Sequence, residues 1–217
     1  RAIRSARLFQ AVGNMLPLVV RISDDDERSA EQLKLDGWRE IEVLETWQHE
    51  APQYFADDHL LTTPNDLDWP FIIRLVGEVE WQDRLHRDRA VLKTYADQAK
   101  VDWITAISKC PTRKTYALIR RDENKGPDPM WCGGFIAVWP GSEFDTIDLW
   151  AVRPDYQIAD AQPYWWLGTS RQLLECAIVR SASKRLRAGT QETNIAARTC
   201  YERIGMKIMK RQRTFHK

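Results

Sequence analysis

Alternating apolar and polar positions dominate the first third of the chain. Residues 17–22 form a short apolar run and residues 38–47 alternate apolar with charged side chains, so both segments predict β-strands. Between them, Ser23 precedes the acidic residues 24–27 and Gly37 follows an apolar pattern, which predicts a helix with both ends marked. We interpret the acidic run as a solvated helix cap, and a divalent-cation site is the alternative.

The middle of the chain changes from polar to apolar at residue 71. Residues 48–70 are polar and proline-containing, which predicts a connection, and residues 71–76 predict a strand. Residues 88–107 predict a helix. Its expected apolar face repeats every four residues: Val91, Tyr95, Ala99 and Trp103. The connection suggests an N-terminal α/β lobe at residues 1–66 and a larger domain at residues 67–217.

The second half of the chain predicts consecutive strands followed by alternating helices and strands. The expected strands are residues 115–120, 133–139, 146–152, 186–190 and a last one from residue 206, with a Gly- and Pro-rich turn at 122–129. The expected helices start at Gly168, with Leu173, Leu174, Ala177 and Ile178 on it, and span residues 194–204, where Gly205 ends the second. This order predicts an α/β fold whose mixed sheet is antiparallel at its start and flanked by helices.

Composition and charge narrow the class of protein. The 217 residues carry 32 Lys and Arg against 31 Asp and Glu, a net charge of +1, which gives no electrostatic footprint for nucleic acid or an anionic membrane. No apolar run approaches the ~20 residues that span a bilayer. No apolar signal core follows the basic start, so we expect a cytoplasmic protein.

Cysteine, histidine and tryptophan usage adds three expectations. The four cysteines are widely spaced and predict reduced, mostly buried thiols rather than a metal or redox pair. The four scattered histidines likewise predict no metal site. Ten tryptophans supply core and pocket walls and leave room for an apolar interface, such as that of a homodimer.

Two segments of the second half carry candidate chemistry. Gly168, Thr169 and Ser170 place small residues at a predicted helix start, where free N–H groups and the helix dipole bind anions such as phosphate; a plain helix cap is the alternative. Asn194 stands at the next helix start, and Tyr201 follows two turns later on the same face. A Tyr hydroxyl can protonate a departing thiolate. A buried core tyrosine and an ordinary cap are the alternative.

In this order the segments resemble the GNAT superfamily of acyl-CoA-dependent N-acetyltransferases. Leu149-Trp150-Ala151-Val152 resembles the family's central strand, and Gly168-Thr169-Ser170 stands in the place of its pyrophosphate loop. Residues 194–206 are similar to the Asn…Ala…Tyr-Glu-x-x-Gly-Phe signature, with Met206 in place of Phe. The loop departs from the family pattern, because Trp165 occupies the basic or amide position and Ser170 the second small one.

The resemblance implies a GNAT-like central sheet, acetyl-CoA as co-substrate, no metal, and direct attack of an amine on the thioester. It implies that the backbone of Leu149, Trp150, Ala151 and Val152 binds the pantetheine arm and polarises the carbonyl. It also implies that residues 168–170 hold the pyrophosphate, that Asn194 positions the pantetheine or the tyrosine, and that Tyr201 is the general acid. The general base stays open among Glu143, Asp145, Asp148 and a water chain.

A closer resemblance is to the sugar-nucleotide branch, of the dTDP-fucosamine acetyltransferase type. It is carried by the small N-terminal lobe, Arg84-Leu85-His86-Arg87-Asp88, Trp103-Ile104 and Thr214-Phe215-His216. It implies a nucleotide-linked aminosugar as the acceptor, with Arg84 and His86 as candidate contacts; a surface salt bridge is the alternative for both. Two other functions stay open: a GNAT-fold enzyme for a peptide, polyamine or antibiotic, and a non-catalytic module that binds CoA or a protein.

Overall fold

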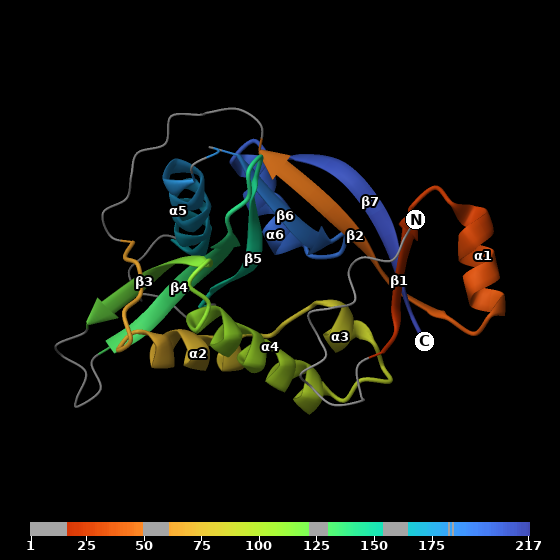
Figure 1. The fold of residues 1–217 in the computed structure, drawn as a ribbon, viewed down its shortest axis with the longest axis horizontal. Coiled ribbons are helices and arrows are strands. Elements are labelled where there is room, and N and C mark those ends of the chain that lie inside the picture. The colour runs from red at the N-terminus through yellow and green to blue at the C-terminus, as the bar shows by residue number, and fades with distance from the viewer. Residues whose placement is uncertain (1–16, 50–60, 122–129, 154–164, 182, 184) are drawn as a thin grey trace.

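In the computed structural model, the described residues form a mixed seven-stranded sheet with helices on both faces (Figure 1). The described residues are 17–49, 61–121, 130–153, 165–181, 183 and 185–217. The strands are β1 (Val19–Ser23), β2 (Arg39–His49), β3 (Lys114–Arg121), β4 (Met130–Trp139), β5 (Asp145–Val152), β6 (Leu186–Gln191) and β7 (Lys207–His216). The helices are α1 (Glu27–Leu35), α2 (Trp69–Glu78), α3 (Arg84–Arg87), α4 (Lys93–Ser108), α5 (Trp165–Arg180) and α6 (Ile195–Arg203).

The sheet has the order β1-β7-β2-β6-β5-β4-β3. Within the described chain β5 and β6 are the one parallel pair, and the other neighbours are antiparallel. This arrangement confirms the α/β fold class and the helix-flanked mixed sheet expected from the order of the elements. The turn predicted at residues 122–129 lies outside the described residues.

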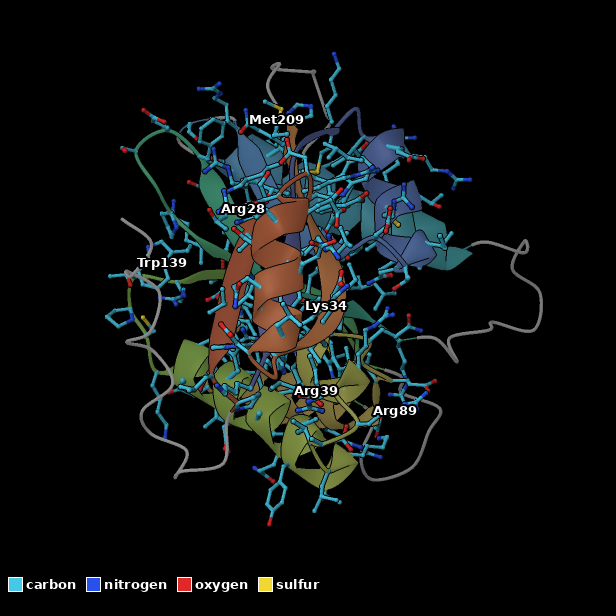
Figure 2. The ribbon with its side chains drawn as sticks, turned by 90° about the vertical axis from the view of Figure 1, so that its right-hand side faces the viewer. Arg28, Lys34, Arg39, Arg89, Trp139 and Met209 are labelled. Carbon is cyan, nitrogen blue, oxygen red and sulfur yellow. The ribbon has the colours of Figure 1, made fainter. Side chains whose placement is uncertain are left out.

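The N-terminal segment is built into this sheet. β2 lies between β6 and β7, and β1 pairs with the outer side of β7. Figure 2 shows α1 in front of this end of the sheet, with Arg28 and Lys34 on it. The predicted end of this helix at Gly37 is confirmed, with a φ of 81°. The start differs from the one predicted at Ser23, which belongs to β1: Asp26, inside the acidic run, caps α1 by accepting a hydrogen bond from the Ser29 N–H. A boundary at residue 66 stays a prediction, and strands from both sides of it pair in one sheet.

Residues 71–76 are helical, so the strand predicted there is wrong. They belong to α2, which begins at Trp69 with Pro70 in its first turn, where the missing proline N–H has no helical partner to lose. The buried side chains of α2 recur at helical spacing: Ile72, Leu75 and Val76. A short, continuous apolar run does not separate a buried strand from a buried helix, and burial against α4 and β4 decides for the helix here.

The helix predicted at residues 88–107 starts later than expected, and its apolar face was predicted wrongly. Residues 88–92 are not helical, α4 covers residues 93–108, and α3 is a separate single turn before Asp88. Tyr95 is 49% exposed. The buried side chains of α4 are Ala96, Lys100, Ile104 and Ile107. Lys100 enters the interior because its Nζ lies 2.6 Å from Asp83 Oδ2 and sits over the Trp81 ring.

The two faces of the sheet have separate hydrophobic clusters. α2 and α4 pack against Ala117, Phe135 and Ala137, whereas α5 packs against the alternate residues Leu118, Ile136 and Val138 (Figure 1). On α5, Leu173, Leu174, Ala177 and Ile178 are buried as predicted. Gly205 ends α6 with a φ of 80°, also as predicted.

The cysteines and the helix lengths complete this description. All four cysteines are free thiols, with Cys110 partly buried and the other three buried, as expected. Where the structure describes the chain, its helices are too short or too polar to cross a membrane.

Candidate functional site

The strands β5 and β6 pair only at their amino ends. In the described chain their register holds two pairs, Asp145 with Leu186 and Thr146 with Arg187. β5 then runs on to Val152, paired on its other side with β4, while β6 runs on to Gln191 beside β2 (Figure 1). Residues 147–152 therefore present a strand edge to β6 without a ladder of hydrogen bonds. Such an edge can bind an extended, amide-containing ligand through its N–H and C=O groups.

A β-bulge accounts for the divergence. Ile147 pairs with Val138 and Leu149 pairs with Ala137, so Asp148 is an extra residue on β5. A bulge bends its strand and increases the local twist, which turns the rest of β5 away from its neighbour. After the bulge, Leu149 and Ala151 pack with the α2 and α4 cluster, and Trp150 and Val152 pack with the α5 and α6 cluster.

Tyr201 lies beside the strand edge of β5. Its ring centroid is 5.9 Å from that of Trp150 on β5 and 5.8 Å from that of Trp47 on β2. The side chain is 1% exposed. Burial raises the pKa of the hydroxyl, and a hydrogen bond with Trp150 opposes the rise. Tyr201 therefore keeps its proton at neutral pH, as a general acid must.

Asn194 occupies the first capping position of α6. Its Oδ1 accepts a hydrogen bond from the Ala197 N–H at 3.2 Å. Asn194 is therefore an ordinary helix cap, which was the alternative to a ligand-positioning role, and the cap uses its side-chain oxygen. The helix that Asn194 starts carries Tyr201 to the β5 edge, so the structure brings together these two predicted residues and the strand at residues 149–152.

The predicted phosphate segment lies inside a helix. α5 begins at Trp165, three residues before Gly168. Gly168, Thr169 and Ser170 therefore follow residues that are already helical, and do not stand at the first helical position as the sequence suggested. Gly168 is exposed with open space where a Cβ would stand, whereas Thr169 is buried and Ser170 is buried and hydrogen-bonded to the Cys200 thiol on α6. Phosphate binding by this segment stays a prediction.

Arg84 and His86 lie on α3, which borders the turn between β6 and α6. Arg87 of α3 donates a hydrogen bond to Thr193, the residue before Asn194. His86 lies between Asp83 and Asp97, at 3.2 and 3.1 Å. Burial lowers the pKa of His86, but hydrogen bonds and charge from the two carboxylates raise it overall. Contact of Arg84 or His86 with an acceptor stays a prediction.

The three carboxylates predicted as possible general bases are Asp145, Asp148 and Glu143, and each lies in a different environment. Asp145 accepts a hydrogen bond from the Gly141 N–H and sits where β5 and β6 are still paired. Asp148, the bulge residue, accepts a hydrogen bond from Arg113 at 2.5 Å. Glu143 is exposed on the turn between β4 and β5. None of these observations singles out one of the three as a base.

Glu42 is a candidate that the sequence did not indicate. The alternating pattern of residues 38–47 predicts solvent for its charged positions, but Glu42 is only 6% exposed. A bulge at Ile41 puts Glu40 and Glu42 on opposite faces: Glu40 bonds Arg213, whereas Glu42 faces Arg84. Burial raises the pKa of Glu42 against the lowering effect of Arg21, Arg84 and a hydrogen bond with Gln191.

Two segments that carried the closer resemblance meet in space. Asp88, after α3, accepts hydrogen bonds from Arg39 at 2.6 Å and from His216 Nδ1 at 2.8 Å. Figure 2 shows Arg39 reaching toward the helices below the sheet. Burial lowers the pKa of His216 despite the opposing effect of Asp88. His216 is therefore neutral and donates from Nδ1, because an ionised Asp88 can only accept.

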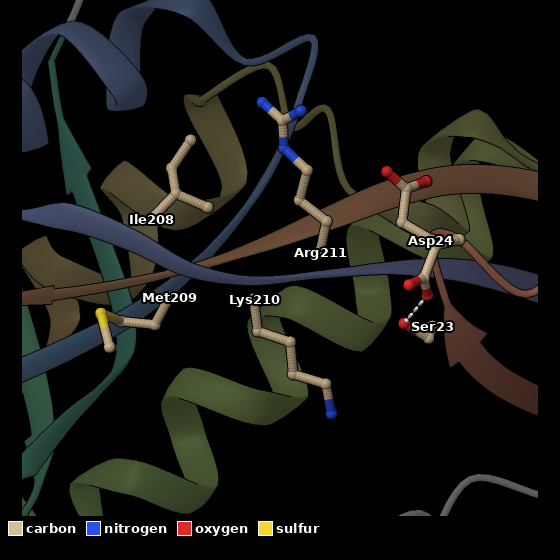
Figure 3. Close-up of a pocket in the computed structure, with 7 residues that line it drawn as sticks. Ser23, Asp24, Ile208, Met209, Lys210 and Arg211 are labelled. Carbon is tan, nitrogen blue, oxygen red and sulfur yellow. Dashed lines mark hydrogen bonds between the residues drawn. The ribbon is translucent and has the colours of Figure 1, made fainter.

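A surface groove lies at a different place, at the outer edge of β7. It has a volume of about 350 Å³ and lies where β1 ends, so that β7 continues past it (Figure 3). Asp24 and Asp25 line one side, and Lys210 and Arg211 line the other. The residues that line the groove include none of the predicted site residues.

No family model matches the sequence, and no curated protein matches it. Solved structures do match the fold. A GCN5-related N-acetyltransferase from Sphaerobacter thermophilus superposes with a TM-score of 0.56 at 12% identity, over 93% of this chain and 60% of that one. A GNAT-family acetyltransferase from Colwellia psychrerythraea gives a TM-score of 0.51 at 12% identity, over 91% and 63%. A conserved Staphylococcus epidermidis protein described as functionally unknown gives 0.60 at 13% identity, over 92% and 72%.

These comparisons confirm the fold that the sequence resemblance implied. The neighbours named as acetyltransferases belong to the GNAT family, and identities this low show the fold alone. The chain spans less than two thirds of the length of those two neighbours. The sugar-nucleotide branch stays a prediction. In the described chain, no three His, Cys, Asp or Glu side chains are grouped so as to hold a metal ion.

Proposed function

We propose that this protein is an acyl-CoA-dependent N-acyltransferase that moves an acetyl or short acyl group to a primary amine. The observation that carries the proposal is the unpaired edge of β5 at residues 147–152, with the protonated Tyr201 hydroxyl beside it. The likeness in fold to GNAT-family acetyltransferases supports it.

The edge of β5 would bind the pantetheine arm of acyl-CoA, and α5 would bind its pyrophosphate. The free backbone groups of Leu149, Trp150, Ala151 and Val152 suit the amides of the pantetheine arm, and an N–H there would polarise the thioester carbonyl. Gly168 lies in the first turn of α5 with room for a phosphate, and Thr169 and Ser170 follow it. Acyl-CoA supplies the activated acyl group, and the protein's part is to align it with the amine.

We propose proton transfers that use the positions of α6 and β5. The amine nitrogen attacks the carbonyl carbon, the C–N bond forms and the C–S bond breaks. Tyr201 gives its proton to the departing sulfur, and the proton lost by the attacking nitrogen restores the Tyr201 hydroxyl. Asn194, as the cap of α6, holds the helix that positions Tyr201.

The acceptor proposal is narrower and rests on resemblance. We propose a nucleotide-linked aminosugar as the first acceptor to examine, with Arg84 and His86 as its contacts and with a cytoplasmic protein, as a monomer or homodimer, as the setting. A peptide, a polyamine and an antibiotic amine are the alternatives within the same chemistry. A module that binds CoA or a protein without catalysis is the alternative outside it, and the departures at Trp165 and Ser170 favour that alternative.

The test separates cofactor binding from transfer. Titration calorimetry with CoA and acetyl-CoA is expected to show binding, and mass spectrometry of an amine panel with acetyl-CoA is expected to show an acetylated product. Gly168→Glu should weaken CoA binding at least tenfold through charge repulsion. Gly77→Glu is the matched control, because Gly77 is also a helical glycine with open space around it. Binding without any product supports the non-catalytic module, and no binding at all refutes the proposal.

A further inference from the structure

Glu42 has a buried carboxylate oxygen with nothing to bond. Among the described residues, Oε2 has no hydrogen-bond partner and is inaccessible to solvent. A buried polar atom without a partner loses its hydration and gains no bond in exchange, so folded proteins rarely keep one. The cost is largest for a charged group. A carboxylate oxygen in this state is a candidate contact for a ligand that completes its bonding; Asp145 Oδ2 is in the same state, but it lies where β5 and β6 are still paired.

The groups facing Glu42 come from four elements. β1 provides Arg21, α3 provides Arg84 together with its capping residue Asp83, and β6 provides Gln191. β7 provides Thr214, the pairing partner of Glu42. Asp83 is neutralised by Lys100, at 2.6 Å, and by His86. Arg21 and Arg84 therefore bring two guanidinium groups close enough to act on Glu42 by their charge.

A second unpartnered atom lies on the same face. His216 is two residues beyond Thr214 on β7, so both side chains are on one face of that strand. Asp88 fixes its Nδ1, and in the part of the chain that the structure describes its buried Nε2 has no partner. Arg84 acts electrostatically on both Glu42 and His216. Glu42 and His216 thus each have an unsatisfied buried acceptor within the range of the Arg84 charge.

This face adjoins the open end of the diverging strands. Gln191, which bonds Glu42, is the last residue of β6, and α3 bonds Thr193 just after it. Glu45, three positions from Glu42 with no bulge between them, faces the other way and pairs with Arg198 on α6 at 3.1 Å. Glu42 thus lies across the sheet from α5 and α6, the side proposed to hold acyl-CoA.

We propose that Glu42 binds the ammonium group of the acyl acceptor and takes its proton, and that the acceptor carries an anionic group as well as the amine. This inference rests on the proposed function. The ammonium gives one proton to the Glu42 carboxylate, which later releases it to solvent, and the neutral amine attacks the thioester. The two guanidinium groups near Glu42 suit a carboxylate or phosphate on the acceptor and disfavour a polycation.

The experiment compares Glu42→Gln with the wild type and with Glu40→Gln, measuring kcat/KM against pH with acetyl-CoA. Glu40→Gln is the matched control, because it removes a carboxylate of the same strand that faces Arg213 on the opposite side. Glu42→Gln should lower kcat/KM at pH 7 by about 10²–10⁴-fold, with the Kd of acetyl-CoA unchanged. The loss should shrink as the pH approaches the pKa of the amine, because the amine then loses its proton to solvent. Glu42→Asp should retain part of the activity.

The Tm of Glu42→Gln separates the proposed role from a structural one, because a structural role would lower it. A raised carboxyl pKa in the folded state means that stability is lost as the pH rises through that pKa. Glu42→Gln removes this loss, so its Tm at pH 8 should equal or exceed that of the wild type. A lower Tm together with unchanged kcat/KM would assign Glu42 a structural role and overturn the inference.

The acceptor panel tests the anionic group. A nucleotide-linked aminosugar and a free amino acid present phosphate and carboxylate respectively, and spermidine presents neither. Higher kcat/KM for either of the first two supports the proposal and tells the anions apart, whereas spermidine as the best acceptor overturns it. If the wild type acetylates no amine, the proposed function fails and this inference fails with it. If the wild type is active and Glu42→Gln matches it, only this inference fails.

Discussion

Tyr201→Phe is the substitution that tests the proposed chemistry most directly. It removes one hydroxyl and keeps the ring that packs between Trp47 and Trp150. In the proposed mechanism this removes the general acid, so the thiolate must depart without its proton or take one from water. We expect kcat to fall by about 10²–10⁴-fold, the usual contribution of a positioned acid. The Kd of acetyl-CoA should stay within about threefold of the wild-type value, because the ring and the β5 edge are unchanged.

The same substitution has a structural cost that must be measured separately. The indole of Trp150 hydrogen-bonds the Tyr201 hydroxyl, and phenylalanine leaves that buried N–H unpaired. An unsatisfied buried donor costs about 1–3 kcal/mol. In a chain of this length that lowers the Tm by roughly 2–4 °C per kcal/mol. Trp150→Phe removes the other partner, so the double variant should lose less stability than the two single changes added together.

The pH dependence separates an acid from a merely buried tyrosine. Burial raises the pKa of Tyr201, so the wild-type hydroxyl stays protonated up to and beyond the ordinary tyrosine value of about 10. Stopped-flow measurement of single turnovers should therefore show no loss of rate on the alkaline side below that pH. If Tyr201→Phe retains single-turnover rates within twofold at every pH while it is folded at the assay temperature, Tyr201 is not the acid.

The remaining predictions concern the frame around the site. Asn194→Ala removes the cap of α6 and should cost about 1 kcal/mol in urea unfolding; a rise of the acetyl-CoA KM far beyond that would give Asn194 a ligand contact as well. Asp88→Asn should cost about 1.5–3 kcal/mol by losing charged hydrogen bonds, against about 0–1 kcal/mol for the more exposed Asp97→Asn. Burial raises the pKa of Asp88, but its hydrogen bonds lower the pKa by more, so the pKa is below its ordinary value. The stability of the wild type should therefore fall as the pH drops below about 4, and Asp88→Asn should lack this part of the fall. Equal acid unfolding curves for the two proteins would contradict this prediction. Gly134→Val should cost about 1–3 kcal/mol in Tm-derived stability, because its Cβ would stand 3.1 Å from the Ala151 carbonyl oxygen; an unchanged Tm would show that β4 and β5 can move apart.

Local patterns determined much of this protein. The alternation of residues 38–47 predicted β2, and the small set of cap residues marked helix ends, with Asn194 at one start and Gly37 and Gly205 at two stops. Caps and positive-φ glycines depend on hydrogen bonds and sterics within a few residues, so the sequence alone carries them. The order of the last strands and helices was predictable for the same reason.

The tertiary structure decided which apolar run became a helix and where charges point. Residues 71–76 have the composition of a strand, and their burial between α4 and β4 makes them helical. Tyr95 was predicted to be inside, and the actual face of α4 places Lys100 there, since Asp83 and Trp81 pair with its charge. Propensity is a weak prior that packing against distant residues overrides.

Some residues of the candidate site were indicated by the sequence, and others became apparent only in the tertiary structure. The sequence by itself indicated Tyr201, Asn194 and the strand at residues 149–152 through their types and order. The divergence of β5 from β6, the turning of Glu42 away from solvent, and the meeting of Asp88 with His216 were decided only in the folded chain. Each depends on a bulge or on strand register between residues far apart in sequence. One extra residue in a strand moves the following side chains to the other face, and a pattern of period two does not show where that residue falls.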